Sequence, residues 1–435
     1  MNSIRVGICG LGTVGTGTLE LLRNNAADIA DRAGCHVEVV RIGARSDRPG
    51  VDTGAIPVSR DVMDVAADPD VDILVELIGG TDTALDLVNA SIAAGKHVVT
   101  ANKALIAEYG NDLFAAADEA AVNIGFEAAV AGGIPIIKAL REGLSANRVQ
   151  WLAGIINGTG NFILTEMKDK GRPFEDVLAE AQALGYAEAD PTFDVEGIDA
   201  AHKLVILAAI AFGMPLEFDK VYTEGISSIQ TEDVDYAEEL GYRIKHLGIA
   251  RRSDLGIELR VHPTLIPERR LLANVNGVKN AVLVEGDAVG PTHYYGAGAG
   301  GEPTASAVVA DIVDLARNLT RGQRPAVSEL GVRPQAIAHQ PILPMDDVET
   351  AWYLRMTAED KPGVLSEVAS ICSRAGVSIE ALIQKEPAEG ETRVPVIILT
   401  NRTREGELNR VASEIESLGS IEGRITRIRV EALDG

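Results

Sequence analysis

Residues 4–15, IRVGICGLGTVG, decide the fold of the first part of the chain. The apolar run Ile4–Cys9 predicts a strand, and the glycine-rich turn after it opens a helical stretch, Val14–Arg23. In that position a GxGxxG turn lets the backbone approach a pyrophosphate, which faces the helix N-terminus. The pattern therefore predicts dinucleotide binding, and the alternative is a turn with a structural role alone. The residues concerned are Gly10, Gly12, Thr13, Val14 and Gly15.

Short β-branched runs continue to alternate with Ala- and Leu-rich stretches of helical length up to residue 126. A helix is expected at Thr83–Ala94, and strands are expected at His36–Ala44, Ile73–Leu77, His97–Thr100 and Val122–Phe126. Strands separated by helices are typical of βαβ units. We predict an α/β fold with a Rossmann-like parallel sheet.

The pattern changes near Ala131 and indicates a mixed α+β domain. The expected helices are Phe162–Lys170, Phe174–Leu184 and Asp199–Phe212, and the expected strands are Trp151–Ile156, Gly256–His262 and Ala281–Glu285. The glycine-rich segment Gly290–Gly301 predicts a mobile loop that leads into a helix over Thr304–Asn318.

The last quarter of the chain begins with a proline-rich linker, Arg321–Pro344. Beyond it, strand and helix patterns follow in the order βαββαβ, which is typical of a ferredoxin-like unit. We predict a dinucleotide-binding domain over residues 1–130, completed by a helix at 303–320, and a mixed α+β domain over 131–302. A linker over 321–349 and a ferredoxin-like domain over 350–435 complete the division.

Composition limits the possible functions. At 435 residues and about 150 per domain, three domains are expected. Forty basic against 64 acidic side chains leave a net charge of −24, which argues against nucleic-acid binding. The three cysteines form no zinc or disulfide pattern, and no run is long enough to span a membrane. We expect a cytoplasmic protein with neither membrane nor nucleic-acid partners.

The end of the second predicted strand bears on cofactor choice. The segment Ala44–Arg48 places Arg45 and Arg48 where an acidic residue usually holds the ribose of NAD. The arginines could receive a 2′-phosphate, which favours NADP(H). The alternative is that they are solvated loop residues and that Asp47 serves the ribose.

Two further motifs could carry chemistry. Lys103 comes just after the strand His97–Thr100, at the sheet edge where such folds bind ligands, although a surface lysine is the alternative. Asp199 and Lys203, four residues apart, share a helical face next to the apolar run Leu204–Phe212. An exposed ion pair worth about 0.3–0.5 kcal/mol is the simple interpretation. However, a loop that carries Glu188 and Asp190 precedes this helix. Carboxylates beside a lysine suit recognition of a substrate ammonium, with the lysine as the adjacent proton donor. His202 is given no catalytic role.

Four separated motifs together resemble homoserine dehydrogenase, and the segment from Trp352, with DKPGVL at 360–365, resembles an ACT domain. The motifs are GLGTVG at 10–15, TANK at 100–103, GYAEADPTFDVEGIDAAHK at 185–203 and GAGAGGEPTASAV at 296–308. The resemblance implies NAD(P)-dependent interconversion of L-homoserine and L-aspartate 4-semialdehyde, in threonine, methionine and isoleucine biosynthesis.

The resemblance implies that residues 131–302 form the catalytic and dimerisation domain and residues 350–435 the regulatory ACT domain. It also implies roles for the matching residues. Lys203 would donate the proton to the aldehyde oxygen, Lys103 would line the nicotinamide and substrate site, and Glu188 and Asp199 would hold the substrate amino group. Besides the first glycine turn and Arg45, the implied cofactor contacts are Thr100, Lys103, Gly185 and Gly301. A sodium ion of structural role is implied at Glu127, Val130, Gly132 and Ile134, largely through backbone carbonyls.

The ACT-like region implies regulation by an amino acid, for which the resemblance points to L-threonine, and assembly as a homodimer or homotetramer. No kinase-like segment is expected before Met1. Two other hypotheses stay open at this point. One is a different NADP-dependent semialdehyde dehydrogenase. A phosphorylating enzyme of this kind needs a catalytic cysteine, and Cys9 and Cys35 are poorly placed for a nucleophile. The other is a non-enzymatic sensor of nucleotide and amino acid.

Overall fold

The computed structural model describes residues 3–322, 327–385 and 392–434 and divides into two compact units. Unit 1 consists of Met1–Gly158, Asp199–Val221 and Val278–Gln340, and unit 2 of Thr159–Ile198, Tyr222–Gly277 and Pro341–Gly435. These bounds do not coincide with residues 130, 302 and 350, so the division into three domains stays a prediction. Residues 323–326 of the predicted linker lie outside the described residues.

Unit 1 contains a parallel sheet in the order β3-β2-β1-β4-β5-β6. Its strands are β1 (Ser3–Cys9), β2 (His36–Gly43), β3 (Val58–Ser59), β4 (Ile73–Glu76), β5 (His97–Thr100) and β6 (Ile124–Gly125). This is the doubly wound order in which a dinucleotide binds at the carboxyl ends of the strands, where the order reverses beside β1. The predicted α/β sheet is confirmed.

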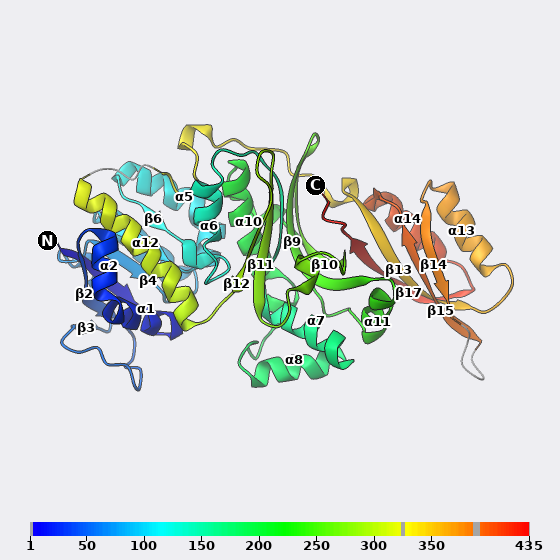
Figure 1. Ribbon diagram of the computed structural model, residues 1–435, viewed down its shortest axis with the longest axis horizontal. Helices are drawn as coiled ribbons and strands as arrows, with labels where there is room; N and C mark the ends of the chain where they lie inside the picture. The colour runs from blue at the N-terminus through cyan, green and yellow to red at the C-terminus, as the bar shows by residue number, and fades with distance from the viewer. Residues whose placement is uncertain (1–2, 323–326, 386–391, 435) are drawn as a thin grey trace. The chain divides into compact units, whose positions relative to one another are not determined.

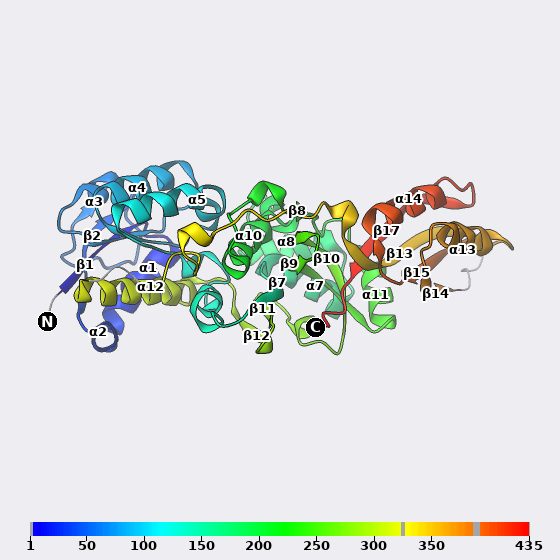
Figure 2. The ribbon, with the colours of Figure 1, turned by 90° about the horizontal axis from the view of Figure 1, so that it is seen from above.

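Helices cover both faces of this sheet. Figure 2 shows α3 (Met63–Ala67), α4 (Asp82–Ala93) and α5 (Lys103–Ala120) on one face. The other face carries α1 (Thr13–Asn24), α2 (Ala26–Ala33) and α12 (Gly301–Arg321). Apolar side chains of α1 and α12 share one core with those of β1, β2 and β4. The helix expected near residue 303 is therefore part of the sheet's cover.

The remaining elements of unit 1 include three antiparallel strands in the order β12-β11-β7. They are η1 (Glu127–Ala129), α6 (Ile136–Lys138), η2 (Ala139–Gly143), β7 (Val149–Ile155), most of α10 (Ile198–Phe212), η3 (Phe218–Lys220), β11 (Lys279–Gly286), β12 (Gly290–Ala297) and η5 (Pro334–Ala336).

The expected mobile loop over Gly290–Gly301 is wrong for most of its length. Residues 290–297 form β12, which pairs with β11 along its whole length. Between the glycines lie Thr292, His293, Tyr294 and Tyr295, and residues of these types favour a pleated strand once a partner strand is present. The loop was predicted because the glycine content of the segment was given more weight than this local β preference.

Unit 2 begins with helices and a long hairpin. Its elements outside the C-terminal domain are α7 (Gly158–Lys170), α8 (Phe174–Ala183), α9 (Thr192–Val195), β8 (Tyr222–Thr223), α11 (Thr231–Glu239), β9 (Tyr242–Ser253), β10 (Gly256–Pro267) and η4 (Leu272–Asn274). The sequence did not predict β9, because Lys245 and His246 interrupt its apolar pattern although both are buried. The Lys245 ammonium donates to the Val275 carbonyl at 2.6 Å.

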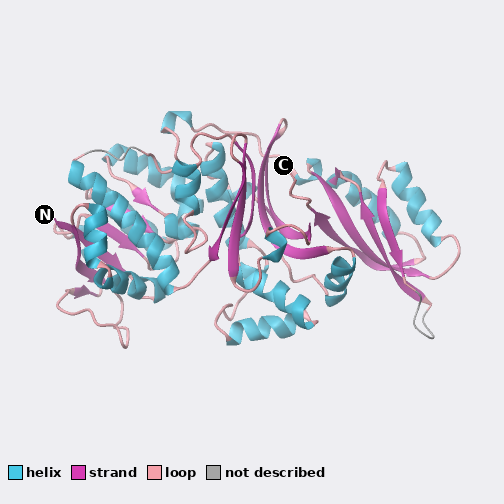
Figure 3. Cartoon of the chain, viewed as in Figure 1, coloured by secondary structure: helices cyan, strands magenta, loops and turns pink. Residues whose placement is uncertain are grey.

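The C-terminal part of unit 2 has the predicted βαββαβ order. Its elements are β13 (Glu349–Glu359), α13 (Val364–Arg374), β14 (Ile379–Gln384), β15 (Arg393–Thr400), the short β16 (Thr403–Arg404), α14 (Glu405–Glu416) and β17 (Ile421–Val430), preceded by η6 (Met345–Asp347). The strand order is β17-β13-β15-β14, and α13 and α14 share one core with alternate residues of β13 and β15 (Figure 3). On its outer edge β17 pairs with β10, through Thr264 and Arg429 among others.

Figure 1 follows the chain through these elements from β1 to β17. Part of the predicted linker pairs with β10: the Ile257 N–H donates to the Pro341 carbonyl at 2.8 Å, and Ile342 forms a parallel bridge with Ile257. Within the described ranges, no helix combines the length and the apolar composition that a membrane crossing requires.

Candidate active site

The glycine turn after β1 has the geometry that a dinucleotide needs. Gly10 has a φ of 105°, which favours glycine, and Gly12 precedes the first turn of α1. A Cβ atom on Gly15 would lie 1.9 Å from the Gly10 carbonyl oxygen, so α1 can pack this close to the turn only with glycine there. Thr13 and Val14 form the helix N-terminus, whose N–H groups favour a phosphate.

A second helix begins beside this turn. A Cβ atom on Gly17 would lie 2.9 Å from the Gly301 carbonyl oxygen, and one on Gly301 would lie 3.2 Å from Cγ2 of Thr13. The start of α12 thus lies against the start of α1. The structure brings Gly301 to the predicted cofactor turn although nearly 300 residues separate them in sequence.

A hollow of about 790 Å³ opens at the carboxyl ends of β1, β2 and β4. Gly10 and Gly12 line it, together with Arg45, Arg48 and Arg60. Arg60, which the sequence analysis missed, donates to the carboxylate of Asp47 at 2.7 Å. The position of Arg60 next to β3 could have been found only with the strand order known.

Thr100 has a different environment from the one expected for a cofactor contact. Its side chain is fully buried, its hydroxyl donates to the Glu76 carboxylate at 2.5 Å, and it accepts from the Asn102 N–H. Asn102 in turn accepts from the Leu105 N–H and so caps α5. The hydroxyl therefore fixes the turn that places Lys103 in the first turn of α5.

Three of the predicted catalytic and substrate-binding residues meet in unit 1. The Lys203 ammonium lies 2.6 Å from Oδ2 of Asp199, and the Lys103 ammonium lies 3.1 Å from Oδ1. The Asn157 amide donates to Oδ2 at 2.9 Å, and Lys203 also donates to the Ile156 carbonyl at 2.8 Å. One carboxylate thus holds two ammonium groups, one from α5 and one from α10.

Burial and neighbouring charges shift the pKa of Asp199 in opposite directions. The residue is 3% exposed. Burial by itself would raise its pKa, but the charges of Lys203 and Lys103, with hydrogen bonds from Lys203 and Asn157, hold the pKa well below its usual range. The carboxylate is therefore ionised at neutral pH. Burial, assisted by the charge of Lys103, lowers the pKa of the neighbouring His202 to about 4, so that its ring is neutral.

Glu188 and Gly185 belong to unit 2, on the loop between α8 and α9. Glu188 is exposed, and its backbone carbonyl accepts from the Gln182 amide at 3.0 Å. Gly185 has a φ of 74° just after α8, which again favours glycine. The loop thus presents a carboxylate to solvent, as recognition of a charged substrate requires.

The proposed cation loop follows β6. The Glu127 carboxylate accepts from the Ile137 and Lys138 N–H groups, at 2.9 and 2.8 Å, and so caps α6. Ala131 and Gly132 both have positive φ, and the Ile134 carbonyl accepts from the Ile136 N–H. In the described part of the chain, no group of three or more His, Cys, Asp or Glu residues could hold a metal ion. A cation here would depend on backbone carbonyls.

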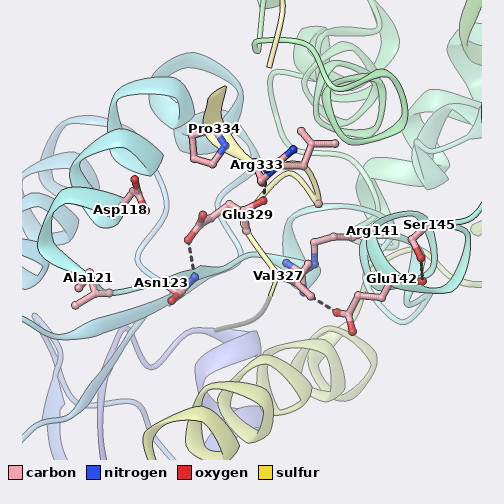
Figure 4. Close-up of a pocket in the computed structure, with 14 residues that line it drawn as sticks. Asp118, Ala121, Asn123, Arg141, Glu142, Ser145, Val327, Glu329, Arg333 and Pro334 are labelled. Atoms are coloured by element: carbon pink, nitrogen blue, oxygen red, sulfur yellow. Dashed lines mark hydrogen bonds and ion pairs between the residues drawn. The ribbon is translucent and has the colours of Figure 1, made fainter. Parts of the chain in front are cut away.

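A separate hollow, with a volume of about 500 Å³, lies in unit 1 near β6. Figure 4 shows the residues that line it. Glu329, which lines it, accepts from the Asn123 amide at 2.9 Å, and burial raises the pKa of Glu329. Arg141 and Glu142 lie on its other side. None of the predicted catalytic or cofactor residues lines this hollow.

The fold and the lysine–aspartate cluster define a class: an oxidoreductase with a dinucleotide-binding domain and an appended ferredoxin-like domain. Family models match the chain in three places, described as "Homoserine dehydrogenase, NAD binding domain" over residues 10–127, "Homoserine dehydrogenase" over 135–313 and "ACT domain" over 352–420. The chain belongs to the homoserine dehydrogenase family, whose members are oxidoreductases.

Relatives and solved structures agree. Homoserine dehydrogenases from Pseudomonas aeruginosa and Neisseria gonorrhoeae are 62% and 53% identical, each over 100% of both chains. A homoserine dehydrogenase structure from Thiobacillus denitrificans matches 100% of this chain and 99% of its own, with a TM-score of 0.95 and 60% identity. A hyperthermophilic archaeal homoserine dehydrogenase in complex with NADPH covers 72% of this chain and 97% of its own, with a TM-score of 0.62 and 27% identity.

Proposed function

We propose that this chain interconverts L-homoserine and L-aspartate 4-semialdehyde by hydride transfer, with Lys203 exchanging the proton at the substrate oxygen. The observation that carries the proposal is the buried Asp199 carboxylate with the Lys103 and Lys203 ammonium groups on its two oxygens. A bound nicotinamide supplies or accepts the hydride. The residues of the chain supply orientation, charge and the proton.

Lys203 acts at the atom where charge develops. When the aldehyde is reduced, negative charge builds on its oxygen, and an ammonium within hydrogen-bond reach stabilises that charge and donates the proton. The contacts of Lys203 with Asp199 and the Ile156 carbonyl hold its ammonium in one orientation. Such preorganisation avoids the cost of ordering the group during the reaction.

Glu188 and Asp199 are the proposed contacts of the substrate amino group. Both oxygens of Asp199 already accept from protein donors, so Asp199 also orients the two lysines. Lys103, in the first turn of α5, is the proposed second cation beside the nicotinamide and the substrate.

NADP(H) is the proposed cofactor, and NAD(H) a poorer one. The residues fit a dinucleotide, because a Cβ atom at Gly15 would block the turn and the hollow beside it is lined by three arginines. Arg45 and Arg48 would face a 2′-phosphate, and the ion pair between Asp47 and Arg60 leaves Asp47 less suited to the ribose. The archaeal relative in complex with NADPH supports this choice.

A sodium ion is proposed at the carbonyls of Glu127, Val130, Gly132 and Ile134. The positive φ values at Ala131 and Gly132 turn the backbone sharply at this loop, and hard cations of this kind prefer oxygen ligands. Glu127 would contribute its carbonyl, since its carboxylate already caps α6. A higher thermal midpoint in NaCl than in choline chloride of equal ionic strength supports the site, and equal midpoints refute it.

L-Threonine is the proposed effector, bound at the turn around Asp360–Gly363 between paired ACT domains of a homodimer or homotetramer. Feedback by threonine fits an enzyme of threonine, methionine and isoleucine biosynthesis. The three cysteines are unpaired and buried, which agrees with the reducing conditions of the cytoplasm as the proposed location.

One assay tests the proposed activity, cofactor and effector. Purified protein is mixed with L-homoserine and either NADP⁺ or NAD⁺, and the absorbance of the reduced nicotinamide is followed with and without L-threonine. Homoserine-dependent reduction, faster with NADP⁺ and slowed by threonine, is expected. Reduction unaffected by threonine refutes the effector, and no reduction by protein that binds NADPH refutes the activity.

A further inference from the structure

A buried arginine in unit 2 is held between two carboxylates. The Arg429 guanidinium, on β17, donates to both oxygens of Glu405, at 2.9 and 2.6 Å, and to Oε2 of Glu224 at 2.6 Å. It also donates to the Tyr222 hydroxyl at 3.0 Å and lies 4.8 Å from the ring of Trp352. Arg429 is 2% exposed and Glu405 is also buried, whereas the Glu224 side chain is about one third exposed. The hydrogen bonds with Glu405 therefore form away from bulk water, and the one with Glu224 lies at the more accessible side of the guanidinium.

The partners of Arg429 lie on different parts of the unit. Glu405 is the first residue of α14, inside the ACT domain, whereas Tyr222 and Glu224 lie in and just after β8, outside it. The Tyr222 hydroxyl also donates to Oε2 of Glu224 at 2.9 Å. The guanidinium therefore ties the last ACT strand to the segment 222–227.

That segment in turn holds the residues before α10. The Ile226 N–H donates to the Val195 carbonyl at 2.9 Å, and the Ser227 hydroxyl donates to the Glu196 carboxylate at 2.7 Å. A Cβ atom on Gly225 would lie 2.2 Å from that carboxylate and 2.7 Å from Cα of Glu196. The two segments are thus in close contact and cannot shift independently.

Gly197 adds a second contact. Its φ is 85°, and a Cβ atom there would lie 3.0 Å from both His246 and Thr223. The ring of His246 makes a hydrogen bond of 2.9 Å with the Glu224 carbonyl. Val195 ends α9, the helix that follows the loop carrying Glu188, and residues 196–197 come directly before α10, which carries Asp199 and Lys203.

We infer that Arg429 is a positioning residue for substrate binding: through Glu224 and Tyr222 it fixes the end of α9 and the turn before α10, the stretch that connects the Glu188 loop to Asp199. The inference rests on the proposed substrate contacts of Glu188 and Asp199. The cofactor residues of the first glycine turn lie between β1 and α1 and at the start of α1, outside this chain of contacts. Loss of the Arg429–Glu224 contact therefore weakens homoserine binding more than NADP⁺ binding.

A purely structural ion pair predicts a different result. Removing one partner of a buried arginine lowers stability whichever partner is removed, and it changes no Michaelis constant selectively. Glu224 and Glu405 contact the same guanidinium and carry the same charge, but only Glu224 belongs to the segment that holds residues 195–197. They form a matched pair of positions for the test.

The experiment measures steady-state kinetics of Glu224→Gln and Glu405→Gln in the full-length chain, beside the wild type. Glu224→Gln is expected to raise KM for L-homoserine about fivefold or more, the lower end of typical coupling between two sites. Its kcat and its KM for NADP⁺ are expected to stay within about twofold, as are all constants of Glu405→Gln. Glu224 lines a hollow of about 560 Å³, so the neighbouring side chains need not repack around the glutamine side chain of Glu224→Gln.

Tyr222→Phe provides a second variant that keeps every carboxylate. It removes the hydroxyl that donates to Glu224 and accepts from Arg429. A smaller rise in homoserine KM, in the same direction, is expected. The inference is overturned if Glu224→Gln and Tyr222→Phe both leave this KM unchanged, or if Glu405→Gln raises it as much as Glu224→Gln does. Absence of homoserine-dependent turnover in the wild type would instead refute the proposed function.

Discussion

Replacement of Lys203 by methionine tests the proposed proton donor most directly. Methionine keeps a long unbranched side chain beside the apolar stretch of α10 but removes the ammonium. Asp199 keeps its contacts with Lys103 at 3.1 Å and with the Asn157 amide at 2.9 Å, so its charge stays paired. Loss of the Lys203 hydrogen bonds should lower the free energy of unfolding by about 1–3 kcal/mol, which leaves the fold intact.

The expected kinetic effect follows from the role of the ammonium. A general acid contributes about 10²–10⁴-fold, and a preorganised donor to a developing oxyanion contributes about 10²–10³-fold. Because one group performs both tasks, the two factors overlap. We expect kcat to fall about 10³-fold, which corresponds to roughly 4 kcal/mol of barrier.

The assay is homoserine-dependent reduction of NADP⁺, with circular dichroism and NADPH binding as checks on the fold. Lys220→Met is the matched control, since Lys220 lies in η3, shortly after α10, and pairs with Glu217 at the surface. Its kcat should stay within about twofold of wild type. A Lys203→Met protein that folds, binds NADPH and keeps kcat within about tenfold of wild type would refute the role of Lys203 as proton donor.

Three further predictions concern the same machinery. Asp199→Asn should lower the free energy of unfolding at pH 7 by about 3 kcal/mol. Since the folded state lowers the pKa of Asp199, this stability is present above about pH 4 and lost on further acidification. Urea titrations that show a constant difference down to about pH 2 would contradict this. Arg45→Ala should weaken NADPH binding about tenfold and leave NADH binding unchanged, measured by nicotinamide fluorescence; equal losses would count against a 2′-phosphate contact. Gly15→Ala should abolish detectable binding of both cofactors, because the added Cβ would lie 1.9 Å from the Gly10 carbonyl oxygen; wild-type affinity would disprove the packing argument.

Local sequence was sufficient where one residue or one short run decides the structure. The glycines after Cys9 predicted the turn between β1 and α1, because no other side chain fits at Gly15. The βαββαβ pattern after residue 350 was also confirmed, since its alternating apolar residues face α13 and α14. By contrast, the glycine-rich segment 290–297 was predicted as a loop and is strand β12, because pairing with β11 overrode its composition.

Pairs that depend on tertiary structure were harder to predict. The spacing of Asp199 and Lys203 on one helical face was visible in the sequence, and the structure confirms that they form an ion pair. Their contact with Lys103, almost a hundred residues earlier, depends on how α5 and α10 pack. The Arg429–Glu224 contact, across more than 200 residues, left no trace in the local pattern.

The amino-acid sequence alone therefore determined the main strands of the parallel sheet, the order of the C-terminal βαββαβ unit, the cofactor turn and the family to which the chain belongs. These features depend on backbone preferences and side-chain periodicity within a few residues, which a sequence records directly. Only the tertiary structure decided which charges share one carboxylate at Asp199 and which carboxylates enclose Arg429. Such contacts depend on the packing of elements distant in sequence, where burial strengthens each charge interaction and makes its partner essential.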